Sequence, residues 1–515
     1  MTNDIGFELG KNAETVGNKY TSEQAKEHKK TKGQFFTPLS VAKYMASLVT
    51  VEGKRIKILD PGCGLLILSS ALIDILSTQK VDAIELVAYE TDASLRPFIM
   101  EQKDAIKSAL EKKGIEFLFT LVEEDFILSN KGYYSSASNL FLTPSFEQFD
   151  IAVLNPPYFK INNQSEYVKL ANDISSGHPN IYSLFLSLVN LMVREGGEII
   201  SITPRSFTSG QYFKSFRKTF FKQVKIEHLH LFESRTEVFK LDSVLLETII
   251  MKGIKKAVST NDFITITTST NSCDLNELKA FKYKYDEVVS GKDYIIHTPT
   301  SIEAKGIMDI FRSWTGSFLK YNLRVSTGPV VAYRTVEFTH LNPTDTFEET
   351  VPLFWLTNVI QMKVEYPIDD IKKPQYIAVN PKTQPFLIPN KNYILMRRFS
   401  SKDDKSRLIA SPYFANYEFG EFIGVENKLN YIHRPKGFMD RFEVIGVSAL
   451  LNSELFDCYF RSFNGNINVS STELHMMPLP PLADILELGK KLMLMNDFSK
   501  DTIDGIINAQ YEWVK

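Results

Sequence analysis

Short apolar runs alternate with amphipathic helical patterns along residues 33–255. Apolar runs bounded by turn residues are typical of buried strands, and apolar residues spaced three or four apart are typical of helices. We therefore expect strands at residues 55–60, 85–90, 116–121, 151–154, 197–203, 224–231 and 245–252. Helices are expected at residues 41–49, 66–76, 94–112, 182–194 and 212–221.

This alternation predicts the fold class of the first half of the chain. Strands and helices that follow one another with short connections form α/β domains, in which helices cover both faces of a mostly parallel sheet. No helix separates the last two predicted strands. We therefore expect these two strands to form an antiparallel hairpin at one edge of the sheet.

The pattern changes near residue 255. The following residues are rich in Thr, Asn, Pro and aromatic side chains, and their apolar runs are irregular. A chain of 515 residues is also longer than one typical domain. We predict a polar N-terminal arm, mobile or folded as a solvated helix, at residues 1–30. An α/β domain follows at residues 31–255, and a mixed α+β domain at residues 256–515.

Composition limits the candidate partners and the location. The net charge is −2 and the pI about 6.5, so any contact with nucleic acid must use local basic patches. The three cysteines, Cys63, Cys273 and Cys458, lie far apart without metal-ligand spacing, which favours a reducing cytoplasm and no metal site. No apolar stretch approaches the length of a membrane span. We expect a cytoplasmic protein that contacts no membrane.

The tetrad Asn155-Pro156-Pro157-Tyr158 directly follows the apolar strand predicted at residues 151–154. Two prolines fix φ and remove two backbone donors, so the chain must leave the sheet there. The carboxyl ends of strands are where open α/β sheets bind ligands. The amide of Asn155 and the carbonyl of Pro156 can each accept a hydrogen bond from a planar amino group, and the ring of Tyr158 can stack on a heterocycle. A purely structural Pro-Pro turn is the alternative.

Two further predicted strand ends carry residues suited to a nucleoside. Asp60 ends the first strand, and Gly62 and Gly64 then allow a ligand to approach the backbone closely. Glu90 ends the second strand, where a carboxylate can accept hydrogen bonds from both ribose hydroxyls. A glycine turn without a ligand and a solvated acid are the alternatives when each feature is taken alone.

The third strand end completes this pattern. Asp125 can accept from the amino group of an adenine, and Phe126 can lie against its ring. Acids at three successive strand ends predict a nucleoside-bearing cofactor that lies across them. Nothing in the sequence resembles a P-loop, which argues against a nucleoside triphosphate.

These motifs resemble, in order, those of S-adenosylmethionine-dependent DNA methyltransferases that modify the amino group of adenine. The resemblance covers about residues 30–255 and implies a Rossmann-like methyltransferase domain. It implies cofactor contacts by Phe36, Thr37, Asp60, Gly62, Gly64, Glu90, Asp125 and Phe126. It implies catalytic roles for Asn155, Pro156, Pro157 and Tyr158, with Tyr158 and Phe239 stacking on a flipped base.

The C-terminal half has a looser resemblance to type II restriction–modification methylases of the PstI/BsuBI kind. It rests on Thr327-Gly328-Pro329 and on residues 450–453 and 477–480. Residues 256–515 would then form a target-recognition domain that binds double-stranded DNA. The resemblance implies a prokaryotic modification enzyme that acts at the nucleoid, with a restriction endonuclease encoded separately.

One residue departs from the family pattern. The family commonly has glycine two positions after Gly64, where this chain has Leu66. A leucine there could crowd the cofactor, so a catalytically weak DNA-binding relative is one alternative. An enzyme that methylates an RNA base or a protein glutamine amide is the other, because the same tetrad suits any planar amino group.

Some basic and aromatic stretches remain open to two interpretations. Those singled out are Lys214, Arg217, Lys218 and Lys222 on one helical pattern, Arg397-Arg398, and residues 428–436. Each could contact DNA phosphates or form a solvated basic face. His228 and His230 alternate along a strand without a carboxylate or cysteine at metal spacing, and we interpret both as structural.

Overall fold

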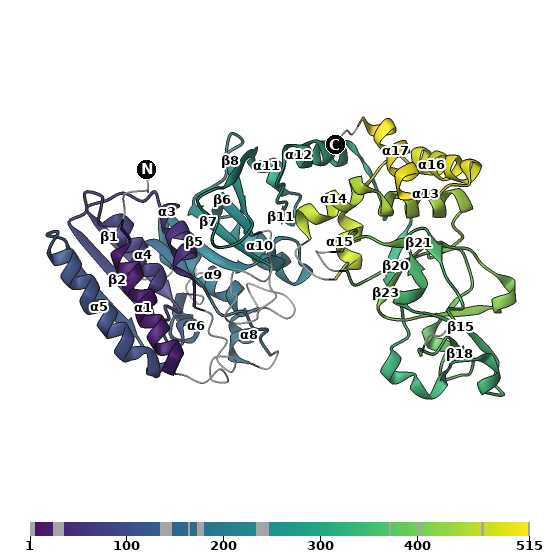
Figure 1. The fold of residues 1–515 in the computed structure, drawn as a ribbon, viewed down its shortest axis with the longest axis horizontal. Coiled ribbons are helices and arrows are strands. Elements are labelled where there is room, and N and C mark those ends of the chain that lie inside the picture. Colours follow the sequence, from purple (N-terminus) through teal and green to yellow (C-terminus); the bar gives the residue numbers. More distant parts are fainter. Residues whose placement is uncertain are drawn as a thin grey trace. The chain divides into compact units, whose positions relative to one another are not determined.

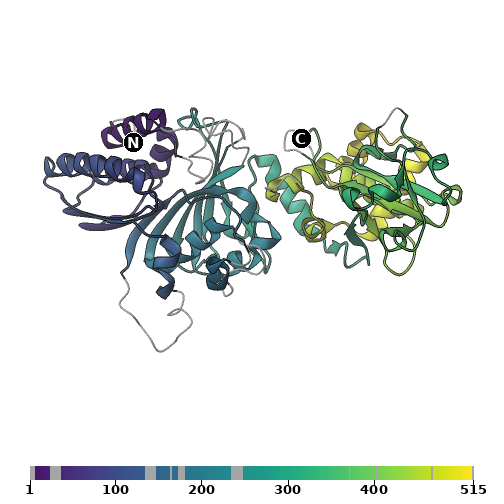
Figure 2. The same ribbon diagram turned by 90° about the horizontal axis from the view of Figure 1, so that it is seen from below.

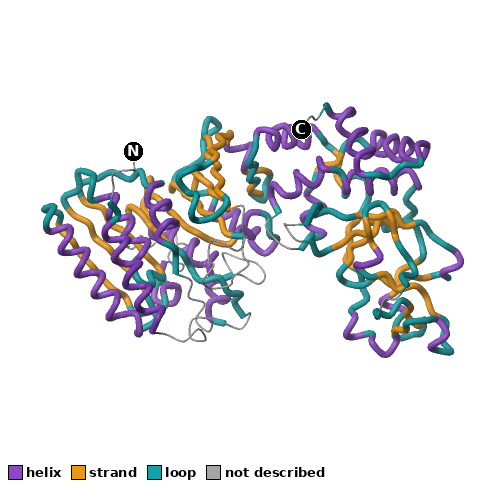
Figure 3. Tube along the Cα trace, viewed as in Figure 1, coloured by secondary structure: helices purple, strands orange, loops and turns teal. Residues whose placement is uncertain are grey.

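The structure, a computed structural model, describes residues 6–23, 36–133, 147–162, 165–171, 180–232, 247–369, 372–400, 404–464 and 468–512. The chain divides into two compact units, Met1–Thr300 and Ser301–Lys515 (Figure 1). Each unit has helices and strands of its own (Figure 3). In the described part of the chain, no helix combines the length and apolar character needed to cross a membrane.

The first unit is built on a nine-stranded sheet with the order β3-β2-β1-β4-β5-β7-β6-β8-β9. The first five strands in this order are parallel neighbours. Their bounds are Glu116–Val122 (β3), Ala83–Tyr89 (β2), Arg55–Pro61 (β1), Phe149–Leu154 (β4) and Val193–Pro204 (β5). Because β1 pairs with β2 on one side and with β4 on the other, the strand order reverses at β1. Such a switch point is where open α/β sheets bind ligands.

Helices cover both faces of this sheet, as the alternating pattern predicts (Figure 2). One apolar core lies under α1 (Glu8–Glu23), α3 (Leu39–Ser47), α4 (Ile67–Leu76) and α5 (Arg96–Glu111). The other core lies under α6 (Phe126–Ser129), α9 (Ile181–Met192) and α10 (Lys214–Phe220). The short helix α8 (Glu166–Ala171) packs Tyr167, Val168 and Leu170 against this second core. The α/β prediction is confirmed.

The N-terminal helix differs from the predicted solvated arm. One side of α1 is buried against the first core, where Ala13 and Tyr20 have no exposed surface. The backbone N–H groups of Leu9 and Gly10 donate to the carboxylate of Asp74 on α4, at 3.3 and 2.9 Å. The helix is therefore part of the first unit. The polar composition of the segment concealed the few apolar residues that anchor it.

The predicted hairpin forms but does not lie at the sheet edge. Strands β6 (Val224–Phe232) and β7 (Thr248–Lys255) are antiparallel. However, β7 lies between β5 and β6, and two more strands, β8 (Phe263–Ser269) and β9 (Lys279–Lys284), extend the sheet. The sheet thus continues beyond the boundary predicted at residue 255. The threonines of β8 made this strand look polar in the sequence. In the structure Thr267 and Thr268 are buried, and the hydroxyl of Thr267 is hydrogen-bonded to His230 at 2.9 Å.

The second unit is mixed α+β. A four-stranded sheet has the order β13-β23-β20-β21, and a five-stranded sheet has the order β14-β18-β15-β22-β19. The strand bounds are Arg324–Thr327 (β13), Leu429–His433 (β23), Tyr393–Arg397 (β20), Ala410–Tyr413 (β21), Thr339–His340 (β14), Tyr376–Ala378 (β18), Thr350–Phe354 (β15), Phe422–Val425 (β22) and Leu387–Pro389 (β19). Its helices are Ile302–Ser313 (α12), Arg441–Asn452 (α13), Glu454–Phe463 (α14), Ser471–Met476 (α15), Leu482–Met495 (α16) and Lys500–Tyr511 (α17).

Short two-residue strands complete the architecture. In the second unit, β12 (Gly316–Ser317) pairs with β24 (Pro478–Leu479), and β16 (Val359–Ile360) pairs with β17 (Lys363–Val364). In the first unit, β10 (Val289–Ser290) follows α11 (Tyr285–Val288) and pairs with β11 (Ile295–Ile296).

The C-terminal motifs singled out in the sequence have structural roles in this unit. A Cβ atom added at Gly328 would lie 2.3 Å from the carbonyl oxygen of Glu426, so only glycine fits there. The side-chain amide of Asn452 donates to the carbonyl of Ala410 at 2.6 Å and accepts from its N–H at 3.1 Å. Both motifs thus join distant segments of the unit through backbone contacts.

Candidate functional site

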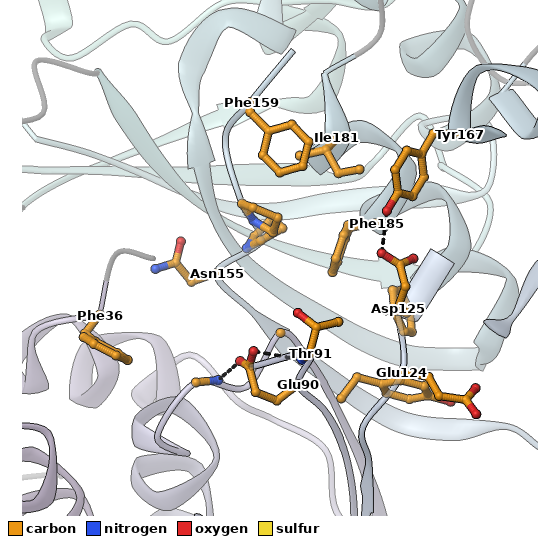
Figure 4. A pocket seen from close by; sticks show the side chains of 16 residues that line it. Phe36, Glu90, Thr91, Glu124, Asp125, Asn155, Phe159, Tyr167, Ile181 and Phe185 are labelled. Carbon is orange, nitrogen blue, oxygen red and sulfur yellow. Dashed lines mark hydrogen bonds between the residues drawn. The ribbon is translucent and has the colours of Figure 1, made fainter. Parts of the chain in front are cut away.

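A cavity of about 420 Å³ lies where β1, β2, β3 and β4 end (Figure 4). Its lining residues are Phe36, Gly62, Gly64, Tyr89, Glu90, Thr91, Glu124, Asp125, Phe126, Asn155, Pro156, Pro157, Phe159, Tyr167, Ile181 and Phe185. The predicted cofactor and catalytic motifs thus meet in one cavity. Its size falls within the range of about 300–1,000 Å³ that is typical of small-molecule sites.

The turn after β1 depends on left-handed backbone. Gly62 and Gly64 have φ angles of 78° and 53°, a region that only glycine adopts without strain. The N–H groups of Gly62 and Cys63 both donate to the carbonyl of Tyr89, at 2.9 Å, which ties the turn to the end of β2. A Cβ atom at Gly64 would lie 3.3 Å from the ring of Phe36. The second glycine therefore lets Phe36 close one wall of the cavity.

Leu66 keeps the left-handed conformation that a glycine would adopt at this position. Its φ is 59° and its ψ is 24°, directly before α4. Its side chain is fully buried in the first core and does not line the cavity. Leucine in place of the family's glycine therefore does not crowd the cavity. Its energetic cost is the strain of a left-handed backbone at Leu66.

Glu90 is held by three backbone N–H groups. Its Oε1 accepts from Thr91 and Asp92, each at 2.9 Å, and its Oε2 accepts from Gly64 at 3.1 Å. Burial raises the pKa of this carboxyl, and the backbone bonds oppose that rise. A carboxylate offers about four acceptor positions. Among the described residues, one position on Oε2 therefore stays open, so a single ribose hydroxyl fits better than the predicted pair.

Asp125 has a matching arrangement at the other end of the cavity. Its Oδ1 caps α6 by accepting from the N–H groups of Ile127 and Leu128, each at 2.9 Å. Its Oδ2 accepts from the hydroxyl of Tyr167 at 2.6 Å. By the same count, one acceptor position on Oδ2 stays open within the described residues. Figure 4 shows the Tyr167 hydroxyl directed at this carboxylate.

Tyr167 is a cavity residue that sequence reasoning missed. It lies on α8, in a segment of the chain where no sequence motif was found, and 42 positions separate it from Asp125. Its hydroxyl pKa is raised, first by burial and then by the bond to Asp125. Phe185 and Ile181 on α9 supply the apolar wall nearby. An aromatic residue at an unremarkable sequence position carries no local signal of this role.

The side chain of Asn155 is oriented by two hydroxyl groups. Its Nδ2 donates to Oγ1 of Thr37 at 3.0 Å, and its Oδ1 accepts from the hydroxyl of Tyr158. The Tyr158 hydroxyl also lies 3.0 Å from the carbonyl oxygen of Ile202. One hydroxyl proton thus serves two acceptors. Thr37, predicted as a cofactor residue, bonds to Asn155 of the tetrad and lines a small neighbouring cavity.

Three predicted residues do not line the main cavity. Thr37 and Tyr158 instead bond to Asn155. Asp60 is 1% exposed, and its Oδ2 accepts from the hydroxyl of Ser69 on α4. Burial raises the pKa of Asp60 to about 7. Phe239, predicted to stack on the base, lies outside the described residues, and its role stays a prediction.

The basic helix α10 fits neither a row of phosphate contacts nor a fully solvated basic face, the two interpretations that its sequence left open. Arg217 is 1% exposed and donates to the carbonyls of Phe207, Gly210 and Asp293. Lys214 and Lys218 both form ion pairs with Asp293, at 2.8 and 3.1 Å. Arg217 is thus structural. The two lysines share one carboxylate, which balances only one of their two charges. The described residues contain no group of three or more His, Cys, Asp or Glu side chains that could hold a metal ion.

Comparison with known proteins identifies the family. The chain is 34% identical over 467 residues to the type II methyltransferase M.BsuBI of Bacillus subtilis, covering 90% of each chain. It is 30% identical over 482 residues to the type II methyltransferase M.PstI of Providencia stuartii, covering 93% of each. The chain belongs to the type II methyltransferases. It is therefore a DNA methyltransferase of a restriction–modification system, which favours DNA over the RNA and protein-glutamine alternatives.

Two further comparisons concern parts of this methyltransferase and its fold. The family model of the Eco57I restriction-modification methylase matches residues 75–239. Among solved structures, the type IIG restriction endonuclease BpuSI aligns at 13% identity with a TM-score of 0.43, over 93% of this chain and 63% of that chain. The DrdV–DNA complex aligns at 13% identity with a TM-score of 0.46, over 90% of this chain and 57% of that one.

Proposed function

We propose that this DNA methyltransferase transfers a methyl group from S-adenosylmethionine to the exocyclic amino group of an adenine in double-stranded DNA. One observation carries the proposal. The acceptors suited to a nucleoside, Glu90 and Asp125, line the same cavity as the acceptors suited to a planar amino group, Asn155 and Pro156. Methyl transfer requires a donor and an amino group to meet in one site, and this cavity brings the two sets of acceptors together.

The acids of the cavity fit the nucleoside part of the cofactor. Glu90 keeps one open acceptor position for a ribose hydroxyl, and Asp125 keeps one for the adenine amino group. Gly62 and Gly64 leave space next to the backbone, and Phe126 and Phe185 supply apolar walls for a ring. When bound, the cofactor would supply an activated methyl group on a positively charged sulfur.

Asn155 and Pro156 would act on the target base. The amino nitrogen of adenine is a weak nucleophile because its lone pair is delocalised into the ring. If Oδ1 of Asn155 and the carbonyl of Pro156 accept its two N–H bonds, they favour the pyramidal geometry that frees the lone pair. This stabilises the transition state rather than the ground state. Positioning in line with the methyl group is then the main task of the protein.

Thr37 and Tyr158 would keep Asn155 in the productive orientation. A side-chain amide presents an acceptor on one side and a donor on the other, so only one orientation can accept from the base. The bond from Nδ2 of Asn155 to Thr37 favours that orientation. With the base in place, the Tyr158 hydroxyl would donate to the carbonyl of Ile202 and leave Oδ1 of Asn155 to the base.

The target adenine must leave the duplex to reach this cavity, at a cost of roughly a few kcal/mol. Stacking on Phe239, and on the ring of Tyr158 next to Asn155, would offset this cost by about 1–3 kcal/mol per face. Because one catalytic domain offers few base contacts, we assign sequence recognition to the second unit, Ser301–Lys515, which makes up most of the predicted domain at residues 256–515. A separately encoded restriction endonuclease would be the functional partner of the enzyme.

Methylation of mixed genomic DNA with labelled S-adenosylmethionine, followed by nucleoside analysis, tests this proposal. We expect the label in N6-methyladenine, at one sequence revealed by modification-sensitive sequencing. Label in N4-methylcytosine would keep the amino-group chemistry but overturn the choice of adenine. Label in a ring-carbon methyl group would overturn the role of Asn155 and Pro156 as amino-group acceptors.

A further inference from the structure

A buried carboxylate in the second unit has three cations around it. Glu426, between β22 and β23, is 1% exposed. Its Oε2 accepts from the backbone N–H of Lys428 at 3.0 Å. Lys428, Lys373 and Arg398 all lie close enough to lower the pKa of this carboxyl, although burial has the larger effect and raises it. The cations come from three segments that only the fold brings together.

Arg398 is fixed in this cluster through the backbone. Its N–H donates to the carbonyl of Lys428 at 3.0 Å, and its Nη1 donates to the carbonyl of Asn427, also at 3.0 Å. The side chains of Lys373 and Lys428 are exposed to solvent. The guanidinium is thus held in place. The ammonium of Lys373 lies 5.5 Å from the centre of the Trp355 ring.

The cluster carries more positive charge than it neutralises. Within the described ranges, Lys373, Arg398 and Lys428 form no ion pair within 4.0 Å with any carboxylate. Arg434, from the same basic stretch of the sequence as Lys428, is paired instead: it binds the carboxylate of Glu443 through two bonds, at 2.7 and 3.0 Å. Like charges held together raise the energy of the free protein, and an anion that binds there relieves the repulsion.

Two exposed aromatic rings lie on segments that adjoin this cluster. Phe399 is 38% exposed, and the guanidinium carbon of Arg398 lies 5.6 Å from the centre of its ring. Val330 forms a parallel β-bridge with Glu426, and three residues further on the ring of Tyr333 is 75% exposed. The guanidinium of Arg334 lies 5.4 Å from the centre of the Tyr333 ring. Cations beside exposed rings suit the phosphates and bases of nucleic acid.

We propose that this basic-aromatic surface, formed by Tyr333, Arg334, Lys373, Arg398, Phe399 and Lys428, is where the second unit contacts DNA. Lys373, Arg398 and Lys428 bind phosphates, and the two rings contact sugars or bases. The inference rests on the proposed assignment of DNA recognition to residues 256–515. It selects Arg398 and Lys428 from the basic stretches of the sequence and excludes Arg434, whose charge is already paired.

The salt dependence of DNA binding tests this surface. The full-length double variant Lys373→Ala/Lys428→Ala removes two charges, and Lys490→Ala/Lys491→Ala is the matched control because both of its lysines are exposed on α16. The probe is a short duplex that carries the sequence methylated by the wild type. Losing two phosphate contacts should lower the slope of log K against log salt by about 1.8, and weaken binding roughly thirtyfold at 0.15 M salt.

The control variant should keep the wild-type slope. Lys373→Ala/Lys428→Arg keeps a cation at position 428 and should lose only about half as much slope as the double alanine variant. Equal slopes for the wild type, the double variant and the control would overturn the proposed DNA-contact surface. An equal fall in slope for both double variants would overturn it as well. Unchanged cofactor affinity shows that the first unit is intact in each case. The proposed function fails separately, if the wild type transfers no methyl group to adenine in any DNA.

Discussion

Leu66 combines a conformation that suits glycine with a side chain that the core needs. Its backbone lies in the left-handed region at φ 59°, and its side chain has no exposed surface. Truncation to alanine removes the buried side chain but keeps the strained backbone. Truncation to glycine removes both. The two substitutions at this one position therefore separate packing from backbone strain.

The expected magnitudes follow from this geometry. Replacing a buried leucine by alanine costs about 2–5 kcal/mol. Holding a residue with a Cβ atom in the left-handed region costs roughly 1–2 kcal/mol, which glycine avoids. Glycine loses about 0.5–1 kcal/mol more than alanine through backbone entropy. We therefore expect Leu66→Gly to be no less stable than Leu66→Ala, and up to about 1.5 kcal/mol more stable.

Leu72 is the matched control, because it is equally buried but lies in the interior of α4. There Leu72→Gly should be about 1 kcal/mol less stable than Leu72→Ala. Urea titrations followed by circular dichroism measure the free energy of unfolding of all four variants. All three tryptophans, Trp314, Trp355 and Trp513, belong to the second unit. Tryptophan fluorescence should therefore show an unchanged transition for that unit.

If glycine is less stable than alanine by the same amount at position 66 as at position 72, this account of the turn is refuted. Cofactor affinity supplies an independent check. Because Leu66 does not line the cavity, calorimetry should give similar S-adenosylmethionine affinities for the wild type and for both substitutions at this position. A large gain in affinity for Leu66→Gly would instead mean that the leucine crowds the cofactor.

Three further predictions concern the cavity, and a fourth concerns the buried Asp60. Asn155→Ala should abolish methyl transfer but keep cofactor binding, and near-normal turnover would contradict its role. Glu90→Ala should weaken cofactor binding by about tenfold, because loss of one charged hydrogen bond costs about 1.5 kcal/mol or more; unchanged calorimetric affinity would place the ribose elsewhere. Tyr167→Ala should weaken cofactor binding more than Tyr167→Phe, because phenylalanine keeps the wall of the cavity; equal affinities would remove Tyr167 from the site. The raised pKa of Asp60, about 7, predicts that stability falls between about pH 4 and pH 7 by up to about 1.4 kcal/mol per pH unit, as the carboxyl ionises only in the unfolded chain. Urea midpoints of Asp60→Asn should lack this decline, and parallel pH profiles would exclude the assignment.

The sequence by itself determined the α/β order of the first unit and the positions of its chemical groups along the chain. Glycine permits positive φ and proline fixes φ wherever they occur, so the turn at Gly62 and Gly64 and the break at Pro156 are local properties. Parallel strands that alternate with helices place their carboxyl ends at one edge. The meeting of Glu90, Asp125 and Asn155 in one cavity follows from these local rules.

Only the tertiary structure decided which partner each side chain has. Thr37 and Asn155 are 118 positions apart, and Tyr167 and Asp125 are 42 apart, so no local pattern records their bonds. The burial of a side chain also depends on all the segments that pack around it. Asp60 is buried outside the cavity, and the side chain of Leu66 lies in the core.

Charge pairing is decided in the same way. Arg434 and Arg398 both lie in basic and aromatic stretches of the sequence, yet Arg434 pairs with Glu443 while Arg398 joins Lys373 and Lys428 around one buried carboxylate. Coulomb energies depend on distance and on burial. The fold sets both quantities for residues that are remote along the chain, and so it decides which charges remain available to DNA.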